Sequence, residues 1–401
     1  MFNKRRWRIC LSFLAVMLLA AACGSDDDGD DAQPEPAAAT EPAATDAPDD
    51  DTADEPEPSD DGDAGDDMAE PEVLWTVPAN GNSDEWVVWD STDCAYVTVD
   101  DHPEIWEPEA ISSHGELVVG WGAQDTVNEV NITMNSSMDD AAALAEVELA
   151  SVDYQFPSTS EPISAAQSIV VREPSVVVSN NQLDDVLESV NEIYFEACIP
   201  VVQVVTQSPG TVLFGPSNAG MGDLQGERLV AFANAQGWTA DNTMLFVTFF
   251  SPAGPEVALR ASVCADVVRD AFPGISEVEH DTTSTTSLEL QNAFTDLLTA
   301  NPDAENIISC TVADLWALAN AEALKVADRH TNAAVTGVNG GSAVLDAIIE
   351  GDTALVGSVD LGAAQWGEYW IPLAQDIAAG TPVPTEVFAP IVMLPVELPA
   401  S

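Results

Sequence analysis

The chain has 401 residues, with 69 acidic and 10 basic side chains and a formal net charge of −59 at pH 7. This surplus of negative charge repels nucleic acid and anionic lipid headgroups, and past residue 72 there is no basic cluster to reverse it. The only bases beyond that point are Arg172, Arg228, Arg260, Arg269, Lys325 and Arg329. Because salt screens surface charge, the acidity is most simply understood as adaptation to saline surroundings.

Residues 1–22 have the pattern of an export signal. Four basic residues precede an apolar stretch of about fourteen residues, which is too short to span a bilayer as a retained helix. The word LAAAC at residues 19–23 resembles a bacterial lipobox, although Ala20 stands where a leucine is usual. The resemblance implies that Cys23 is lipidated and that the protein is exported and anchored on the extracytoplasmic side of the cell membrane. In an ordinary cleaved signal this cysteine would be incidental.

Residues 23–72 form an acidic segment rich in Asp, Pro, Ala and Thr, with no Lys or Arg. Such a composition cannot bury enough apolar surface to offset the entropy of the chain, and its like charges repel one another. We expect a disordered, extended tether between the lipid anchor and the folded body.

Residues 73–115 are rich in tryptophan and proline, with alternating words such as EWVVWD and CAYVTVD. The pattern predicts short strands or an extended arm that packs on the main body. A platform on which carbohydrate stacks is the alternative, and aromatic packing is the simpler of the two roles.

From residue 116 onward, short apolar runs alternate with longer amphipathic ones. The runs predicted as strands are ELVVGW, SIVV, PSVVVS, IPVVQVV, TMLFVTFF, NIISCTV, AAVTGV and ALVGSV. The runs predicted as helices are DDAAALAEVELA, LDDVLESVNEIYFEAC, LQGERLVAFANAQ, EVALRASVCADVVRDAF, SLELQNAFTDLLTA and LWALANAEALKVADRH. Continuously apolar strands between helices indicate parallel sheets covered on both faces, and the length of this body favours an α/β fold with two sheets.

The sequence offers little that points to catalysis. It contains no GxSxG, Walker, HExxH or strand-linked GxGxxG motif, and no spacing typical of metal ligands. The four histidines are scattered, and the word GVNGG at residues 337–341 fits a simple turn as well as a phosphate-binding loop. We therefore expect no enzyme, no cofactor and no metal site.

Four cysteines lie in the body, at positions 94, 198, 264 and 310. An even number in an exported chain permits two disulfides, with three possible pairings.

Several words, in order, resemble the type I periplasmic solute-binding proteins of ABC transporters, the ribose-binding-like group. They are ACIPVVQVV, GPSNAGMGDLQGERLVAFA, SPAGPEVALRASV, VTGVNGGSAVLDAIIEGDTALVGSVD and IAAGTPVPTEVFAPIVML. The resemblance implies two doubly wound parallel-sheet lobes joined by a hinge of three crossings, with a ligand closed between them. It divides the body into an N-terminal lobe, residues 116–215 with 361–388, and a C-terminal lobe, residues 216–360 with 389–401.

The resemblance also implies a set of ligand-binding residues. They are Trp121, Gln124, Asp125, Arg260, Asp314, Asn339, Asp360 and Trp366. Arg260 stands where the family places a ligand-contacting arginine, and its paired N–H donors suit neighbouring hydroxyls or a carboxylate. Purely structural roles stay open for four of them: a surface ion pair for Arg260, a helix cap for Asp314, and buried packing for Trp121 and Trp366.

The lobe assignment further implies that Cys94 pairs with Cys198, fastening the arm, and that Cys264 pairs with Cys310.

The sequence departs from the ribose-binding pattern at three positions: Val205 and Thr206 replace an acid and a base, and Ala313 replaces an asparagine. We therefore do not expect ribose as the ligand, and we expect a larger or less hydroxylated molecule instead.

These observations predict a monomeric, lipid-anchored receptor that captures a small polar molecule, a sugar or related metabolite, and delivers it to an ABC permease. Two alternatives stay open. The first is a ligand sensor that feeds a membrane signalling receptor, and the second is a secreted hydrolase, which lacks a recognisable nucleophile in this sequence.

Overall fold

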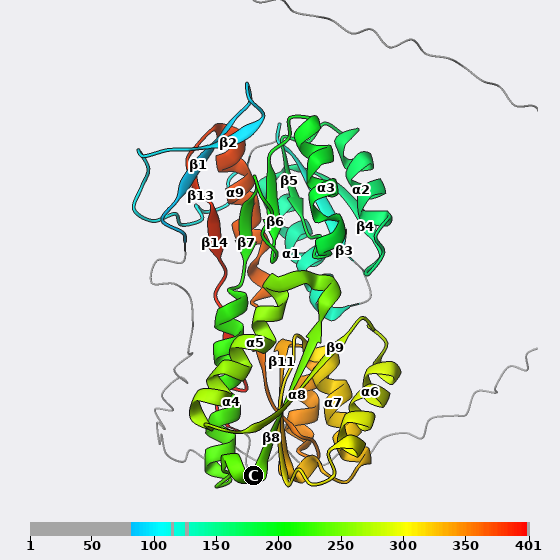
Figure 1. Ribbon diagram of the computed structural model, residues 1–401. Coiled ribbons are helices and arrows are strands. Elements are labelled where there is room, and N and C mark those ends of the chain that lie inside the picture. The colour runs from blue at the N-terminus through cyan, green and yellow to red at the C-terminus, as the bar shows by residue number, and fades with distance from the viewer. Residues whose placement is uncertain (1–81, 114–115, 125–127, 399–401) are drawn as a thin grey trace, which may run out of the picture. The chain divides into compact units, whose positions relative to one another are not determined.

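The computed structural model describes residues 82–113, 116–124 and 128–398. Within these residues the chain forms two six-stranded sheets and one small three-stranded sheet (Figure 1). The predicted α/β fold with two parallel sheets is confirmed. Each large sheet, with the helices that cover it, is called a lobe below.

The first lobe has its strands in the order β14-β7-β6-β5-β3-β4, all of them paired in parallel. Their bounds are β3 (Val118–Gln124), β4 (Glu148–Tyr154), β5 (Val176–Ser179), β6 (Val201–Val204), β7 (Val212–Gly215) and β14 (Glu386–Phe388). The helices are α1 (Glu129–Ala145), α2 (Glu161–Val170), α3 (Asp184–Glu196) and α9 (Gly367–Ala379). Helix α1 packs against α9, and α2 packs against α3. The central strands β5 and β6 are buried along their whole length, which accounts for their mostly apolar sequences, VVVS and VVQV.

The second lobe has its strands in the order β15-β12-β11-β10-β8-β9, in which only β15 runs antiparallel to its neighbour. Their bounds are β8 (Thr243–Phe250), β9 (Ser276–Thr282), β10 (Asn306–Cys310), β11 (Ala333–Asn339), β12 (Leu355–Asp360) and β15 (Val392–Leu394). The helices are α4 (Asn218–Ala235), α5 (Gly254–Ala271), α6 (Ser287–Ala300), α7 (Asp314–Val326) and α8 (Ser342–Glu350). Short 3₁₀ turns lie at η1 (Ala240–Asn242), η2 (Ser251–Ala253), η3 (His330–Asn332) and η4 (Ala363–Gln365).

The chain passes between the two sheets three times. It leaves the first sheet after β7 for α4, returns after β12 through η4 to α9, and leaves again between β14 and β15 (Figure 1). Both sheets belong to one compact unit.

Two sequence predictions about elements are wrong. The run SIVV, expected as a strand, is the end of helix α2, because the buried residues Pro162, Ala165, Ala166 and Ile169 recur with helical spacing. The helix expected over residues 139–150 ends at Ala145, and its last residues open strand β4. The polar edge strand β9, SEVEHDT, has no apolar run and was not predicted.

The tryptophan-rich arm packs on the first lobe through a small sheet. Strand β1 (Trp86–Asp90) pairs with β2 (Ala95–Thr98) and with β13 (Val383–Pro384), all antiparallel. Trp86 is 2% exposed and stacks on His102, and the indole N–H of Trp106 donates to Asp376 on α9 at 2.9 Å. These contacts favour packing over a carbohydrate platform. Trp75, the signal region and the acidic tether lie outside the described residues.

Two disulfides join the pairs expected from the lobe assignment. Cys94, in the turn of the β1–β2 hairpin, is bonded to Cys198 after α3, and Cys264 on α5 is bonded to Cys310 on β10. The first bond attaches the arm to the first lobe, whereas the second lies fully buried in the core of the second lobe.

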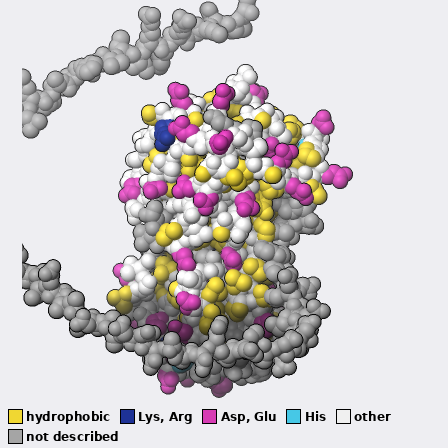
Figure 2. Space-filling view, turned by 180° about the vertical axis from the view of Figure 1, so that it is seen from behind, with side chains coloured by type: hydrophobic (Ala, Val, Ile, Leu, Met, Phe, Trp, Pro, Cys, Tyr) yellow, Lys and Arg dark blue, Asp and Glu magenta, His cyan; other side chains and the backbone are white. Residues whose placement is uncertain are grey.

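Acidic side chains are spread over the described surface that Figure 2 displays, with very little basic surface among them. Among the described helices, none is long and apolar enough to cross a membrane.

Candidate ligand-binding site

A pocket of ≈ 440 Å³ lies where the carboxyl ends of strands from both sheets meet. The first lobe contributes residues at or just after the ends of β3, β4, β5 and β6, and the second lobe contributes residues after β8, β9, β10 and β11. Because the open ends of parallel strands leave a crevice between their loops, this edge is where such sheets bind ligands.

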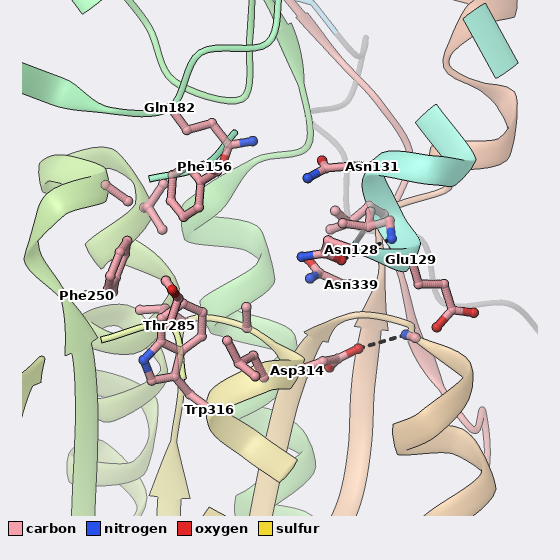
Figure 3. Close-up of a pocket in the computed structure, with 18 of the residues that line it drawn as sticks. Asn128, Glu129, Asn131, Phe156, Gln182, Phe250, Thr285, Asp314, Trp316 and Asn339 are labelled. Carbon is pink, nitrogen blue, oxygen red and sulfur yellow. Dashed lines mark hydrogen bonds between the residues drawn. The ribbon is translucent and has the colours of Figure 1, made fainter. Parts of the chain in front are cut away.

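One side of the pocket carries uncharged amides. In Figure 3, Asn128, the N-cap of α1, and Asn131 on α1 lie on the same side as Asn339, the last residue of β11. Gln124 and Gln182 also line the pocket from the first lobe. Each amide offers both donors and an acceptor, so this side can bind hydroxyl, carbonyl or carboxylate groups.

The other side of the pocket is aromatic (Figure 3). Phe156, in the loop after β4, lies 5.9 Å from Phe250 at the end of β8, and Phe250 lies 5.0 Å from Trp316 on α7. These are distances between ring centroids, and the row of three rings crosses from the first lobe to the second. The planes of neighbouring rings are tilted by 51° and 52°, so the row provides an apolar but faceted surface for the body of a ligand.

Arg260 on α5 supplies the buried positive charge of the pocket. Its side chain is 5% exposed, its Nε donates to Asn218 at 2.8 Å and its Nη1 donates to the carbonyl of Val312 at 3.2 Å. Burial lowers the pKa of Arg260 to about 10, so the guanidinium remains protonated at neutral pH.

Asp314 supports the turn before helix α8 from inside the second lobe. Its two carboxylate oxygens accept from the Ser358 hydroxyl at 2.6 Å and from the Gly341 N–H at 2.7 Å, the second of which Figure 3 draws. Burial raises the pKa of Asp314 to about 7, with smaller contributions from the charges of Glu129 and Asp360, while both hydrogen bonds act in the opposite direction.

The turn itself requires glycine at position 340. Gly340 has φ +69°, and a Cβ there would lie 2.8 Å from the backbone of Asp360. The GVNGG word is therefore accounted for by turn geometry and by the hydrogen bond of Gly341 to Asp314.

Glu129 links the lobes at the edge of the pocket. From the first turn of α1 in the first lobe, its Oε2 accepts from both the backbone N–H and the hydroxyl of Ser342, each at 3.0 Å. Ser342 opens α8 in the second lobe, where the helix dipole favours a negative charge. The contact holds the two lobes together across the pocket.

Four of the residues predicted from the sequence line the pocket: Gln124, Arg260, Asp314 and Asn339. Asp360 lies beside it, where its carboxylate accepts from the Gly362 N–H at 2.9 Å. Asp125 lies outside the described residues.

Trp121 and Trp366, expected as possible ligand-stacking walls, are not among the residues that line the pocket, and this expectation is corrected. Each is 1% exposed in the core of the first lobe, with Trp121 4.8 Å from Trp370 and Trp366 5.6 Å from the same ring. Trp121 packs against α9, and Trp366 is the N-cap of that helix, with its indole N–H donating to the carbonyl of Leu361, so both rings are enclosed in the first lobe.

The sequence analysis missed the aromatic row and the amides of Asn131 and Gln182. Phe250 ends one predicted strand and Trp316 follows another, positions that could have identified them, whereas Phe156 follows β4, which was not predicted. Val205 and Ala313, two of the departures from the ribose-binding pattern, do line the pocket and make it more apolar. Among the described residues, no group of three His, Cys, Asp or Glu is placed to hold a metal ion.

Two lobes with a mixed polar and apolar pocket at the carboxyl ends of their strands define a protein that binds a small solute. The profile described as "Periplasmic binding protein domain" matches residues 119–382, and the chain belongs to this family. A search of curated protein sequences found no significant match.

Solved structures share the fold at low sequence identity. A solute-binding protein of an ABC transporter from Mycobacterium smegmatis, with bound glycerol, is 23% identical, with a TM-score of 0.59 over 69% of this chain and 93% of that one. An ABC sugar transporter subunit from Rhodobacter sphaeroides is 18% identical, with a TM-score of 0.61 over 70% and 98%. A solute-binding protein from Agrobacterium vitis, with bound allitol, is 19% identical, with a TM-score of 0.60 over 69% and 94%.

Proposed function

We propose that the protein is a lipid-anchored extracytoplasmic receptor of an ABC importer, which captures a small polar ligand from the sugars or related metabolites. The observation that carries this proposal is the pocket at the carboxyl ends of both sheets, to which both lobes contribute polar side chains. Its volume suits a molecule of the size of a sugar, and the glycerol and allitol bound by the related structures support the same class.

The proposed mechanism is closure of the hinge. A ligand that touches both walls stabilises the arrangement in which Glu129 reaches Ser342, and so shifts the population toward a closed form. The permease then recognises the closed form and accepts the ligand. Catalysis has no part in this mechanism.

The anchor is proposed on the lipobox-like word that ends at Cys23, and the acidic tether on residues 23–72. Both segments lie outside the described residues. A charged and extended tether would let the receptor reach a permease while it stays on the cell.

One preparation tests both parts of the proposal. The protein is extracted from membranes in mild detergent, and mass spectrometry is applied to its N-terminal peptide and to the small molecules released on denaturation. We expect a lipid mass on Cys23 and a sugar-sized ligand, which on addition back raises the melting temperature by about 2–8 °C at saturating concentration. An unmodified Cys23 would contradict the anchor, and the absence of any bound or stabilising small molecule would contradict the receptor.

A further inference from the structure

The guanidinium of Arg260 is a buried positive charge with no acidic partner among the described residues. Its hydrogen bonds go to the amide of Asn218 and to a backbone carbonyl, both neutral acceptors. None of the ion pairs in the described part of the chain includes Arg260. Burial alone accounts for the lowered pKa of Arg260, with no contribution from a nearby carboxylate. A buried charge without a counter-ion is costly, so its place at the wall of a pocket calls for an anionic occupant.

The other described bases differ from Arg260. Arg172, Arg269 and Lys325 form surface ion pairs with acids. Arg228 and Arg329 donate to backbone carbonyls, but neither lines the pocket. In a chain with 69 acidic residues, Arg260 is thus the one described base that is directed to the pocket and lacks an acid.

The acids at the pocket form no ion pair with Arg260, and three of their four oxygens already accept from protein donors. Both oxygens of Asp314 are engaged by Ser358 and Gly341, and Oε2 of Glu129 is engaged by Ser342. The amides of the first lobe and Asn339 supply further donors and acceptors for ligand hydroxyls. The indole N–H of Trp316 adds a buried donor that has no partner among the described residues.

The aromatic row indicates which kind of ligand body the pocket can bind. Phe156, Phe250 and Trp316 form an apolar face across the pocket from Asn128, Asn131 and Asn339 (Figure 3), which suits a ring with one apolar face and hydroxyls on its edge. The cavity of ≈ 440 Å³ admits such a ring together with one substituent.

We propose that the ligand is a carboxylated polyhydroxy compound, a sugar acid or cyclic hydroxy acid, whose carboxylate pairs with Arg260 while its ring lies between the aromatic row and the amides. This inference rests on the proposed function and narrows its ligand class from sugars in general to their acids. A guanidinium offers a carboxylate two parallel hydrogen bonds, which a neutral hydroxymethyl group at the same place cannot accept.

The test compares matched acid and neutral probes on the full chain, freed of bound ligand by extensive dialysis. Calorimetric titrations at neutral pH and about 0.15 M salt use glucuronate against glucose, galacturonate against galactose, and quinate against myo-inositol. We expect the acid to bind at least about tenfold more tightly than its neutral partner in one pair or more. Sodium acetate serves as the control for a general anion effect. If acetate gives the same heat of binding as the sugar acids, the inference is overturned.

Variants then assign the preference to one side chain. Arg260→Gln is expected to reduce the preference for the acid to less than about threefold, and Arg260→Lys to retain part of it. Arg269→Gln is the matched control, because Arg269 lies outside the pocket, and it should leave the preference unchanged. Circular dichroism establishes that each variant folds. If Arg260→Gln does not fold, the wild-type pairs decide the question without it.

The outcomes separate the inference from the function on which it rests. If the neutral probes bind as tightly as the acids, the carboxylate inference fails and the receptor function stands. If no probe binds, the ligand released from natively extracted protein decides: an acid supports the inference and a neutral compound overturns it. If no probe binds and no ligand is released, both proposals fail.

Discussion

The two walls of the pocket differ in how firmly their side chains are held. In the second lobe Arg260, Phe250, Asp314 and Trp316 are each no more than 7% exposed, and both charged groups are fixed by hydrogen bonds. In the first lobe Gln124 and Asn131 are just as buried, at 3% and 6%, but Asn128 and Glu129 are exposed, and Phe156 and Gln182 are half-buried. The difference indicates that the second lobe presents a preformed surface for recognition, whereas the exposed part of the first-lobe wall would add contacts in the proposed closure.

The largest expected effect comes from truncating one phenylalanine on each wall. Phe250→Ala removes a ring that is 3% exposed, and we expect the free energy of unfolding to fall by about 3–5 kcal/mol. Phe156→Ala removes a half-buried ring, and we expect a loss of about 1 kcal/mol together with weaker ligand binding. Urea denaturation and calorimetry measure the two quantities. Equal losses of stability in the two variants would remove the distinction between the walls.

A smaller effect is expected in the pH dependence of stability, and it tests the buried charge of the second wall. Because the pKa of Asp314 is raised to about 7 in the folded state, the folded protein holds this proton through a range in which the unfolded chain has released it. Stability should therefore fall as pH rises from about 4 to about 7, with a slope of up to about 1.4 kcal/mol per pH unit from this group.

Asp314→Asn should remove that part of the slope. Other carboxylates also titrate in this range, so the difference between wild type and variant, followed by urea denaturation at each pH, is the quantity to measure. Parallel stability profiles for the two proteins would show that Asp314 titrates normally.

The smallest effect is expected at the contact between the walls. Glu129→Gln keeps an oxygen that can accept from Ser342 but removes the charge that favours the start of helix α8, so closure should be weakened and ligand affinity reduced about two- to tenfold. Calorimetry gives the affinity, and small-angle scattering gives the compactness without ligand. Ser342→Ala is the companion variant, since it removes the hydroxyl but keeps the backbone N–H. An affinity unchanged in both variants would contradict a role for this contact in closure.

Sequence reasoning located the second wall better than the first. Arg260 on helix α5 and Asn339 at the end of β11 lie in segments that resemble the family, Asp314 begins the helix after a predicted strand, and each of the three lines the pocket. On the first wall only Gln124 was found among the described residues. The strand β4 that positions Phe156 was not recognised, because its word ELASVDY is polar at alternate positions and follows directly on a helical pattern.

The tryptophans show the limit of a pattern taken alone. Trp121 lies within β3, next to a strand end that does reach the pocket, but alternate residues of a strand point to opposite faces of its sheet. Trp121 therefore meets Trp370 of α9, which comes from a segment about 250 residues later in the chain. Local sequence gives no information about which helix covers which face.

The sequence by itself determined the α/β class, because continuously apolar strands between amphipathic helices can be buried only in covered parallel sheets. It also determined the acidic surface and the positions of the four body cysteines. Only the tertiary structure decided which residues meet. The aromatic row and the contact of Glu129 with Ser342 each join segments from distant parts of the chain. The surroundings of Arg260, which include Asn218 but no acidic partner among the described residues, are also formed by distant segments. Such pairings depend on how the two sheets face one another, and no periodicity within a single segment carries that information.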